Sequence, residues 1–249
     1  MCLDNIAIVL VEPQIPENIG ATARAMCNMG LNRLILINPK NEDPERIKKM
    51  ATGDSAAVIE RMKIYNDFLE AAGDFNFLVG TTARLGNNRP CNIMPRELAE
   101  KLKEITLNNQ AAIIFGREDR GLSNEHLRHC HLNMTIPTAD FSSMNLAHAV
   151  LLVCYELFTA FRRDSLGTKR QSPRLANTFE LEGMYEHLKT ALIKIGFINH
   201  QNPEHWIMNI RRFLSRFPLR AREVRVVRGI CRQIEWYENQ PQKNNNNNF

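Results

Sequence analysis

The chain has 249 residues, 44% of them apolar and 24% charged, which is enough for one large core and a smaller appendage. Its net charge is +5, and no apolar stretch is long and uncharged enough to predict a membrane span. The first residues lack the basic start and cleavage site of a signal peptide, so we expect a cytoplasmic protein whose six scattered cysteines are free thiols.

Short apolar runs alternate with helical patterns through the first two thirds of the chain. The predicted strands are residues 6–11, 33–37, 76–80, 111–116 and 134–136. Strands that alternate with helices form a mostly parallel sheet with helices on both faces. Residues 1–163 are therefore expected to be a single α/β domain.

The helix predicted after the first strand carries an isolated arginine. Pro16 and the acidic residue after it indicate the helix start, and Gly30 indicates its end. Arg24 has Gly20 one turn before it, which predicts open space on that side. Helical side chains lean toward the N-terminus, so we expect Arg24 to reach the carboxyl end of the first strand, where ligands of α/β sheets bind. The alternative is a solvated surface arginine.

A helix is predicted over residues 144–161, with Ser142 or Ser143 as its cap. This helix is apolar almost all round, whereas a helix on one sheet face needs only one apolar side. We expect a second buried partner, first of all a homodimer interface. The alternative is a helix buried within one subunit.

The last third of the chain reads as a separate part. Residues 164–177 are a predicted polar linker, residues 178–240 a helical extension and residues 241–249 a disordered low-complexity tail. Within the extension, helical spacing covers 178–196, 203–215 and 219–238. Three of its aromatic residues could stack on nucleic-acid bases, but we expect them in the core of the extension. They are Trp206, Trp236 and Tyr237.

Positive charge is concentrated in the same extension. Between Arg211 and Arg232 there are eight arginines and one acidic residue, Glu223. Such a cluster repels itself unless an anion is near, which predicts RNA binding, with a solvated helical face as the alternative. The candidate RNA-binding residues are Arg211, Arg212, Arg216, Arg220, Arg222, Arg225 and Arg228.

Glycine-containing loops follow the later strands. They are VGTTAR at 79–84, IFGREDRGLSNEH at 114–126 and IPTADFSSMNLAHAV at 136–150. No G-x-G-x-x-G motif follows the first strand and no Walker A motif is present, which argues against a Rossmann cofactor site and a P-loop. The later loops instead predict a cofactor pocket at the carboxyl edge of the sheet.

The segment EHLRHCH, residues 125–131, contains possible zinc ligands. No second Cys/His pair at finger spacing follows, and adjacent residues at a helix end point in different directions. We expect this segment to finish a helix before the 134–136 strand, and we expect no metal.

Three of these segments carry a family resemblance. PENIGATARAM, FGREDRGLSN and IPTADFSSMNLAHAV resemble, in order and spacing, the three motifs of the SPOUT family of RNA methyltransferases. The tail segment FLSRFPLRAREVRVVRGICRQIE resembles that of the tRNA 2'-O-methyltransferases acting on cytidine or uridine 32. The resemblance implies a SPOUT fold with a deep trefoil knot, an obligate homodimer, a tRNA substrate and S-adenosylmethionine as cofactor.

The resemblance also implies site residues. Those expected against the cofactor are Thr81, Thr82, Ala83, Gly116, Ile136, Ser143, Met144 and Asn145. The expected catalytic residues are Arg24, Ser143 and Asn18. An arginine, with a pKa above about 12, is a poor base. Arg24 of one subunit is therefore expected to clamp the phosphate or ribose of the target nucleotide, and to pass a proton only as the reaction proceeds.

Two further residues of the motifs bear on the site. Glu118 is expected to support the loop rather than to act on substrate. Phe141 stands where members of this type often carry tyrosine, which puts the nucleotide preference in doubt. The alternative functions are a SPOUT enzyme for rRNA or another tRNA position, and an RNA-binding relative without catalysis.

Overall fold

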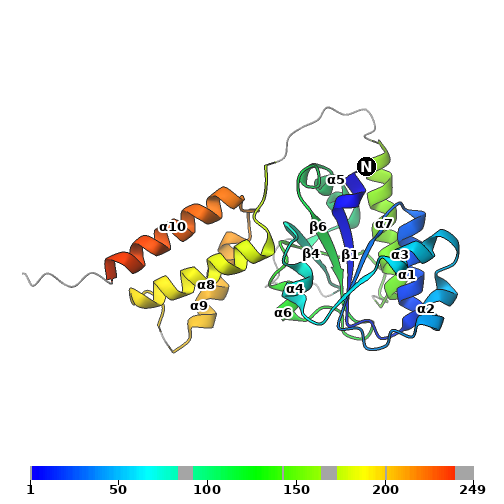
Figure 1. The fold of residues 1–249 in the computed structure, drawn as a ribbon, viewed down its shortest axis with the longest axis horizontal. Coiled ribbons are helices and arrows are strands. Elements are labelled where there is room, and N and C mark those ends of the chain that lie inside the picture. Colours follow the sequence, from blue (N-terminus) through cyan, green and yellow to red (C-terminus); the bar gives the residue numbers. More distant parts are fainter. Residues whose placement is uncertain (1, 84–91, 142, 164–172, 200, 239–249) are drawn as a thin grey trace, which may run out of the picture. The chain divides into compact units, whose positions relative to one another are not determined.

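The computed structural model describes residues 2–83, 92–141, 143–163, 173–199 and 201–238. The chain divides into two compact units, residues 1–178 and 179–249 (Figure 1). Within the described residues, no helix is long and apolar enough to cross a membrane.

The first unit is built on a seven-stranded sheet in which every pair of neighbours is parallel. The spatial order is β3-β2-β1-β6-β4-β7-β5. The strands are β1 (Ile6–Val11), β2 (Arg33–Ile37), β3 (Lys63–Tyr65), β4 (Phe77–Thr81), β5 (Asn92–Ile93), β6 (Ala111–Phe115) and β7 (Leu132–Met134). The predicted α/β class with a parallel sheet is confirmed.

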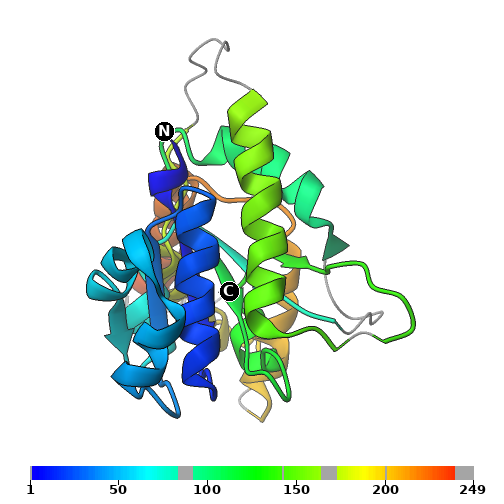
Figure 2. The same ribbon diagram turned by 90° about the vertical axis from the view of Figure 1, so that its right-hand side faces the viewer.

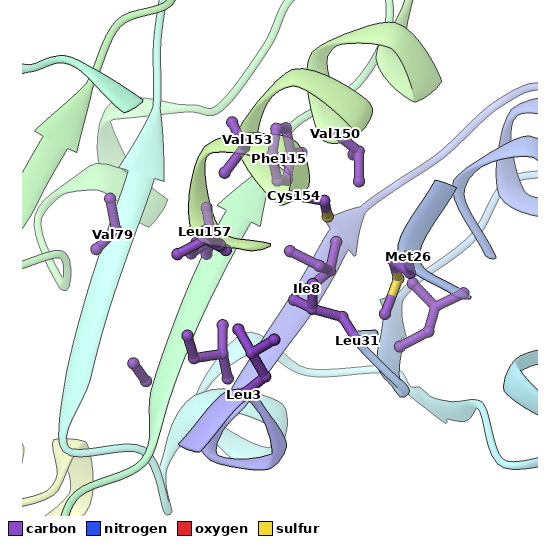
Figure 3. Packing of buried hydrophobic residues seen from close by; sticks show 14 of the residues in the cluster. Leu3, Ile8, Met26, Leu31, Val79, Phe115, Val150, Val153, Cys154 and Leu157 are labelled. Carbon is purple, nitrogen blue, oxygen red and sulfur yellow. The ribbon is translucent and has the colours of Figure 1, made fainter. Parts of the chain in front are cut away.

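Helices cover both faces of this sheet. In chain order they are η1 (Cys2–Asn5), α1 (Pro16–Asn28), α2 (Pro44–Met50), η2 (Gly53–Ser55), α3 (Ala56–Glu60), α4 (Phe68–Ala72), α5 (Pro95–Ile105), α6 (Asn124–Leu127) and α7 (Leu146–Arg163). Side chains alternate along β1, so Ile8 faces α1 and α7 while Val9 faces α4 and α6. The core on the first face is drawn in Figure 3, where Val153 and Leu157 of α7 lie over the sheet.

Helix α7 packs between α1 and α5 (Figure 2). Its inner side, which includes Val150 and Cys154, is buried, whereas Leu152 and Tyr155 are exposed on its other side. The predicted serine cap is wrong: the Oδ1 of Asn145 accepts hydrogen bonds from the backbone N–H groups of Ala147 (2.9 Å) and of the next residue (3.3 Å). The asparagine side chain therefore sets where the helix begins.

The expectation of open space beside Gly20 is also wrong. A Cβ on Gly20 would lie 2.2 Å from the carbonyl oxygen of Ile47 and 2.9 Å from the Cβ of Met50. The glycine lets α1 and α2 approach closely, so it serves helix packing. Arg24, one turn later, lies on the exposed side of α1.

The helices of the second unit are α8 (Thr178–Lys194), whose first residue belongs to the first unit, α9 (Pro203–Leu214) and α10 (Ala221–Glu238), each within two residues of its predicted limits. The buried residues of this unit include Met184, Tyr185, Ile207 and Val224. The prediction that Trp206, Trp236 and Tyr237 form the core of this unit is wrong, because all three are exposed. The exposed fractions are 43% for Trp206, 56% for Trp236 and 77% for Tyr237.

The end of the predicted linker is attached to the first unit. The Oδ1 of Asn109 accepts a hydrogen bond from the backbone N–H of Leu175 at 2.8 Å, and its Nδ2 donates to the carbonyl of Pro173 at 3.1 Å. Thr178 donates from Oγ1 to the carbonyl of Phe75 at 3.1 Å. These bonds fix residues 173–178 against the sheet domain.

Cys27, Cys130, Cys154 and Cys231 are free, as expected, and the last three are buried. Burial raises the pKa of Cys130 and Cys154 to about 12, so these thiols stay protonated. They act as small apolar side chains in the core.

Candidate active site

A cavity of about 320 Å³ lies at the carboxyl ends of β4, β6 and β7. Three loops line it, those that follow these strands, so residues distant in sequence meet at one sheet edge. Of the predicted cofactor residues, the lining includes Thr81, Thr82, Ala83, Gly116, Ile136, Ser143 and Met144. Asn145, Asn18 and Arg24 are not part of this lining.

The loop after β6 depends on two glycines. A Cβ on Gly116 would lie 2.1 Å from the carbonyl carbon of Gly121 and 2.2 Å from the nitrogen of Leu122, so no side chain fits there. Gly121 has a φ of +69°, a backbone conformation that L side chains rarely adopt. Together they fold the loop back so that its backbone borders the cavity.

The loop after β4 is tied to both neighbouring strands. Thr81 donates from Oγ1 to the carbonyl of Ile114 on β6 at 3.0 Å. The backbone N–H of Thr82 donates to the carbonyl of Met134 on β7 at 2.9 Å. These bonds hold the β4 end of the cavity in register with the other two strands.

Glu118 connects this loop to the start of α1. Its carboxylate accepts hydrogen bonds from the backbone N–H groups of Gln14 (3.0 Å) and Ile15 (3.3 Å) and from the Nδ2 of Asn18 (2.9 Å). Two of the donors precede α1, and the third, Asn18, lies in its first turn. This geometry agrees with the loop-supporting position expected for Glu118.

The hydrogen-bond chain continues from Asn18 to the start of α7. The Nδ2 of Asn145 donates to the Oδ1 of Asn18 at 2.9 Å, while its own Oδ1 caps α7. Asn18 is buried and both atoms of its amide are engaged. The three motif segments, far apart in the sequence, are therefore joined by one chain of side-chain bonds, Glu118 to Asn18 to Asn145.

Arg117 is a site residue that the sequence interpretation missed. Its guanidinium bonds to both carboxylate oxygens of Asp119 (3.0 and 3.1 Å) and to the Oε2 of Glu12 (3.1 Å). Bonding to Asp119, and then to Glu12, raises the pKa of Arg117, and the same arginine lowers the pKa of Asp119. The signal was present in the sequence as an arginine two residues before an aspartate in a glycine loop.

The remaining predicted residues around the cavity differ in their surroundings. Ser143 lines the cavity and is exposed. The side chain of Arg24 is exposed on α1 and has no hydrogen bond or ion pair with another described residue. Phe141 is also exposed. The single chain thus brings all of the predicted cofactor residues except Asn145 to the cavity lining, and Arg24 is not among the lining residues.

The three histidines of residues 126–131 pack against phenylalanine rings, two of them against the same ring. The rings of His126 and His129 lie 5.0 and 5.5 Å from that of Phe68, and His131 stacks on Phe77 at 5.0 Å. The Nδ1 of His131 accepts a hydrogen bond from the backbone N–H of Leu78 at 3.1 Å, and burial lowers its pKa to about 4. Among the described residues, no group of three or more His, Cys, Asp or Glu could hold a metal ion.

The arginines of the second unit fall into two sets. Arg211 pairs with Glu182 of α8, and its guanidinium lies 4.1 Å from the centre of the Tyr185 ring. This arginine fastens α9 to α8 inside the unit. The other six candidates are exposed, and their side chains form no hydrogen bond or ion pair with any residue in the described ranges. They are Arg212, Arg216, Arg220, Arg222, Arg225 and Arg228.

Comparison with known proteins gives one family match for the sheet domain and another for the helical unit. Residues 5–155 match the SpoU rRNA Methylase family, and the chain belongs to this family of methyltransferases. Residues 179–247 match the C-terminal domain of the tRNA methyltransferase TrmJ, which places the chain with the TrmJ members of the family.

Relatives match over nearly the whole chain. The tRNA (cytidine/uridine-2'-O-)-methyltransferase TrmJ of Photorhabdus laumondii is 35% identical over 236 residues, which cover 94% of this chain and 98% of that protein. The tRNA (cytidine/uridine/adenosine-2'-O-)-methyltransferase TrmJ of Pseudomonas aeruginosa is 34% identical over 245 residues, covering 94% and 95%. The crystal structure of TrmJ from Z. mobilis ZM4 has a TM-score of 0.78 and 30% identity, covering 92% of this chain and 98% of that one.

Proposed function

We propose that this protein transfers a methyl group from S-adenosylmethionine to the ribose 2'-hydroxyl of tRNA, at cytidine or uridine 32 of the anticodon loop. The observation that carries the proposal is the cavity at the carboxyl ends of β4, β6 and β7, where the loops of the second and third family motifs meet the loop after β4. The names of the relatives support tRNA as the substrate and the ribose 2'-oxygen as the acceptor. A tRNA substrate in turn supports the predicted cytoplasmic location.

The residues present fit the proposed cofactor. A cavity of about 320 Å³ falls within the range of small-ligand sites, and Leu122, Met134 and Ile136 give it an apolar wall. The close approach of Gly116 to Gly121 leaves backbone groups, rather than side chains, to face the ligand's polar atoms. When bound, S-adenosylmethionine supplies the methyl group, and the residues that line the cavity would hold it.

The chain from Glu118 through Asn18 to Asn145 is proposed to align the site. It joins the loop after β6, the start of α1 and the start of α7, so the acceptor nucleotide and the cofactor would be held by one connected frame. Alignment of two bound reactants accounts for much of the rate in such transfers. Ser143, on the cavity wall, would orient the 2'-hydroxyl or the cofactor.

Arg24 is proposed to act on the cavity of a second subunit. Arg24 is exposed and has no partner within the described chain, so its guanidinium is available to bind a phosphate or ribose of the substrate. A homodimer would supply that geometry, and the exposed Leu152 and Tyr155 on α7 support an interface there. The guanidinium would clamp the nucleotide as its hydroxyl loses a proton.

We also propose that the end of the first unit is knotted as a deep trefoil. The strand order supports this, because β7 lies between β4 and β5 although it follows both in the chain. Beyond β7 the chain continues along the cavity into α7. Residues 84–91, between β4 and β5 in the chain, lie outside the described ranges.

The test is methylation of total RNA that lacks modifications, with labelled cofactor and mapping of the labelled nucleotide. We expect label in tRNA at position 32, and none in a matched tRNA that carries a 2'-deoxynucleotide there. Because the matched family is named for rRNA, rRNA is the second candidate substrate. Label in rRNA with silent tRNA would overturn the tRNA assignment, and no binding of cofactor at millimolar concentration would leave only a non-catalytic RNA-binding protein.

A further inference from the structure

Two phenylalanines of the second unit are held out in solvent. Phe213 lies in the last turn of α9 and is 64% exposed, and Phe217 follows four residues later with 71% exposed. The turn between them is fixed, because the backbone N–H of Ser215 donates to the carbonyl of Arg211 (2.8 Å) and that of Phe217 to the carbonyl of Leu214 (3.4 Å). The two rings are therefore presented by an ordered part of the chain.

Exposure of both rings is costly unless something covers them. Burying a phenylalanine side chain is among the larger favourable contributions to folding, yet the buried residues of this unit are others, among them Met184, Tyr185 and Ile207. A pair of exposed aromatic residues on a small helical unit indicates a binding surface. The charges around the rings indicate what would bind.

Unpaired arginines alternate with the two phenylalanines. Arg212 and Arg216 directly precede Phe213 and Phe217, and Arg220 follows. The three guanidinium groups are exposed and have no hydrogen bond or ion pair with other described residues, and no acidic residue occurs between 212 and 222. The acidic residue that comes next, Glu223, accepts from the backbone N–H of Arg220 at 2.8 Å. A partner must therefore offer both negative charge and flat apolar faces.

We infer that Phe213 and Phe217 form a stacking platform for unpaired RNA nucleotides, with the neighbouring arginines on the phosphates. An aromatic side chain stacks on a base only where the base is free of its helix, so the platform favours single-stranded RNA over a duplex. The inference rests on the proposed function, in which a tRNA loop is the substrate. It assigns to the helical unit the recognition of unpaired nucleotides in addition to the attraction of phosphates.

The test compares a single-stranded RNA oligonucleotide with the same sequence closed into a duplex, without cofactor, by fluorescence anisotropy on the full chain. For the single strand, Phe213→Leu with Phe217→Leu should weaken binding ~10-fold or more and leave the salt dependence unchanged, because stacking carries no charge. Arg212→Gln with Arg216→Gln should reduce the salt dependence for both RNAs. The matched control is Phe179→Leu, an exposed aromatic residue on α8 outside the arginine run.

Single-strand affinity that is unchanged in the double leucine variant would overturn the inference, as would equal loss of single-strand and duplex binding. Two other occupants are also distinguishable. Loss of binding to anionic lipid vesicles with RNA binding intact would assign the rings to a membrane surface, and a changed oligomeric state on sedimentation would assign them to a second copy of the chain. Failure of methylation alone, with stacking confirmed, would overturn the proposed function and leave the platform in place.

Discussion

The Nδ2 of Asn145 donates a hydrogen bond to the Oδ1 of Asn18 at 2.9 Å, across 127 positions of sequence. One amide thus serves two purposes, since the Oδ1 of the same Asn145 caps α7. Asn18 in turn donates a hydrogen bond from its Nδ2 to the carboxylate of Glu118. The start of α1, the start of α7 and the loop after β6 cannot shift independently while these bonds persist.

The substitution Asn145→Asp separates the two roles of this side chain, the cap on α7 and the hydrogen bond to Asn18. The carboxylate keeps the acceptor that caps α7 and loses the donor that reaches Asn18, so the helix should stay intact while the frame is broken. A lost bond to a buried partner costs about 1–3 kcal/mol. We expect methyl transfer to fall ~10-fold or more and the Tm to fall by several degrees, while the helical circular dichroism stays that of the wild type. Wild-type turnover in this variant would mean that the frame has no part in alignment.

Arg24→Ala should abolish methyl transfer while cofactor affinity, measured by calorimetry, stays nearly unchanged, because Arg24 lies outside the cavity lining. Stability should change by less than about 0.5 kcal/mol, as for other exposed substitutions. Arg61→Ala, which removes another exposed and unpaired arginine of the first unit, is the matched control and should remain active.

Mixing experiments test whether Arg24 acts across subunits. The Arg24→Ala and Asn145→Asp chains are dissociated and reassembled together. In a mixed dimer, the site of the Arg24→Ala chain keeps the bonds from Glu118 through Asn18 to Asn145 and receives Arg24 from the Asn145→Asp chain. Activity above that of either variant alone is the expected result. Turnover that stays at the level of the separate variants would contradict action in trans.

Stability should decline as the pH falls, because of His131. Burial lowers its pKa from 6.5 to about 4 in the folded chain, so between these values the unfolded chain binds a proton that the folded chain does not. The contribution is fully present above pH 6.5 and is lost progressively toward pH 4, by up to about 3 kcal/mol.

Urea unfolding at pH 7.5, 6 and 4.5 measures this effect. His131→Gln, whose amide oxygen can still accept from Leu78, should flatten the pH dependence, whereas His148→Gln on the exposed side of α7 should not. The same slope in both variants would show that carboxylates, rather than His131, dominate acid unfolding.

Removal of residues 179–249 should weaken tRNA binding and flatten its salt dependence, because the six exposed arginines leave with the second unit. The cut follows Thr178, since residues 173–178 are bonded to the first unit. Filter binding across a salt series is the measurement, and cofactor affinity is the control. Unaltered RNA affinity would show that the first unit alone holds the RNA.

Long buried strands could be predicted from sequence, whereas short ones could not. β1 and β6 are continuous apolar runs buried on both faces, and such runs are typical of central parallel strands. β3 and β5 contain only three and two residues and form because a neighbouring strand offers free backbone groups. The last strand, β7, lies two residues before its predicted position because Leu132 and Asn133 pair with β4.

Most of the cavity lining could be predicted, because motif residues occur in the loops that form it. The partners of individual side chains could not be predicted. The sequence around Gly20 does not indicate that α2 packs against it, because Ile47, which makes the contact, comes 27 residues later. In the sequence, nothing distinguishes Arg211 from the other arginines of the run. In the structure it pairs with Glu182 and lies over the ring of Tyr185. In each case the deciding contact is between distant residues, and helical spacing carries no information about it.

The position of β7 between β4 and β5 has a consequence for how the protein matures. β5 pairs with β7, which is made about forty residues later, so that sheet edge and the cavity close only when a late segment inserts between two earlier ones. Insertions of this kind make refolding slow. The ability to bind the methyl donor should therefore be the last property regained after dilution from denaturant, well after helical circular dichroism has returned.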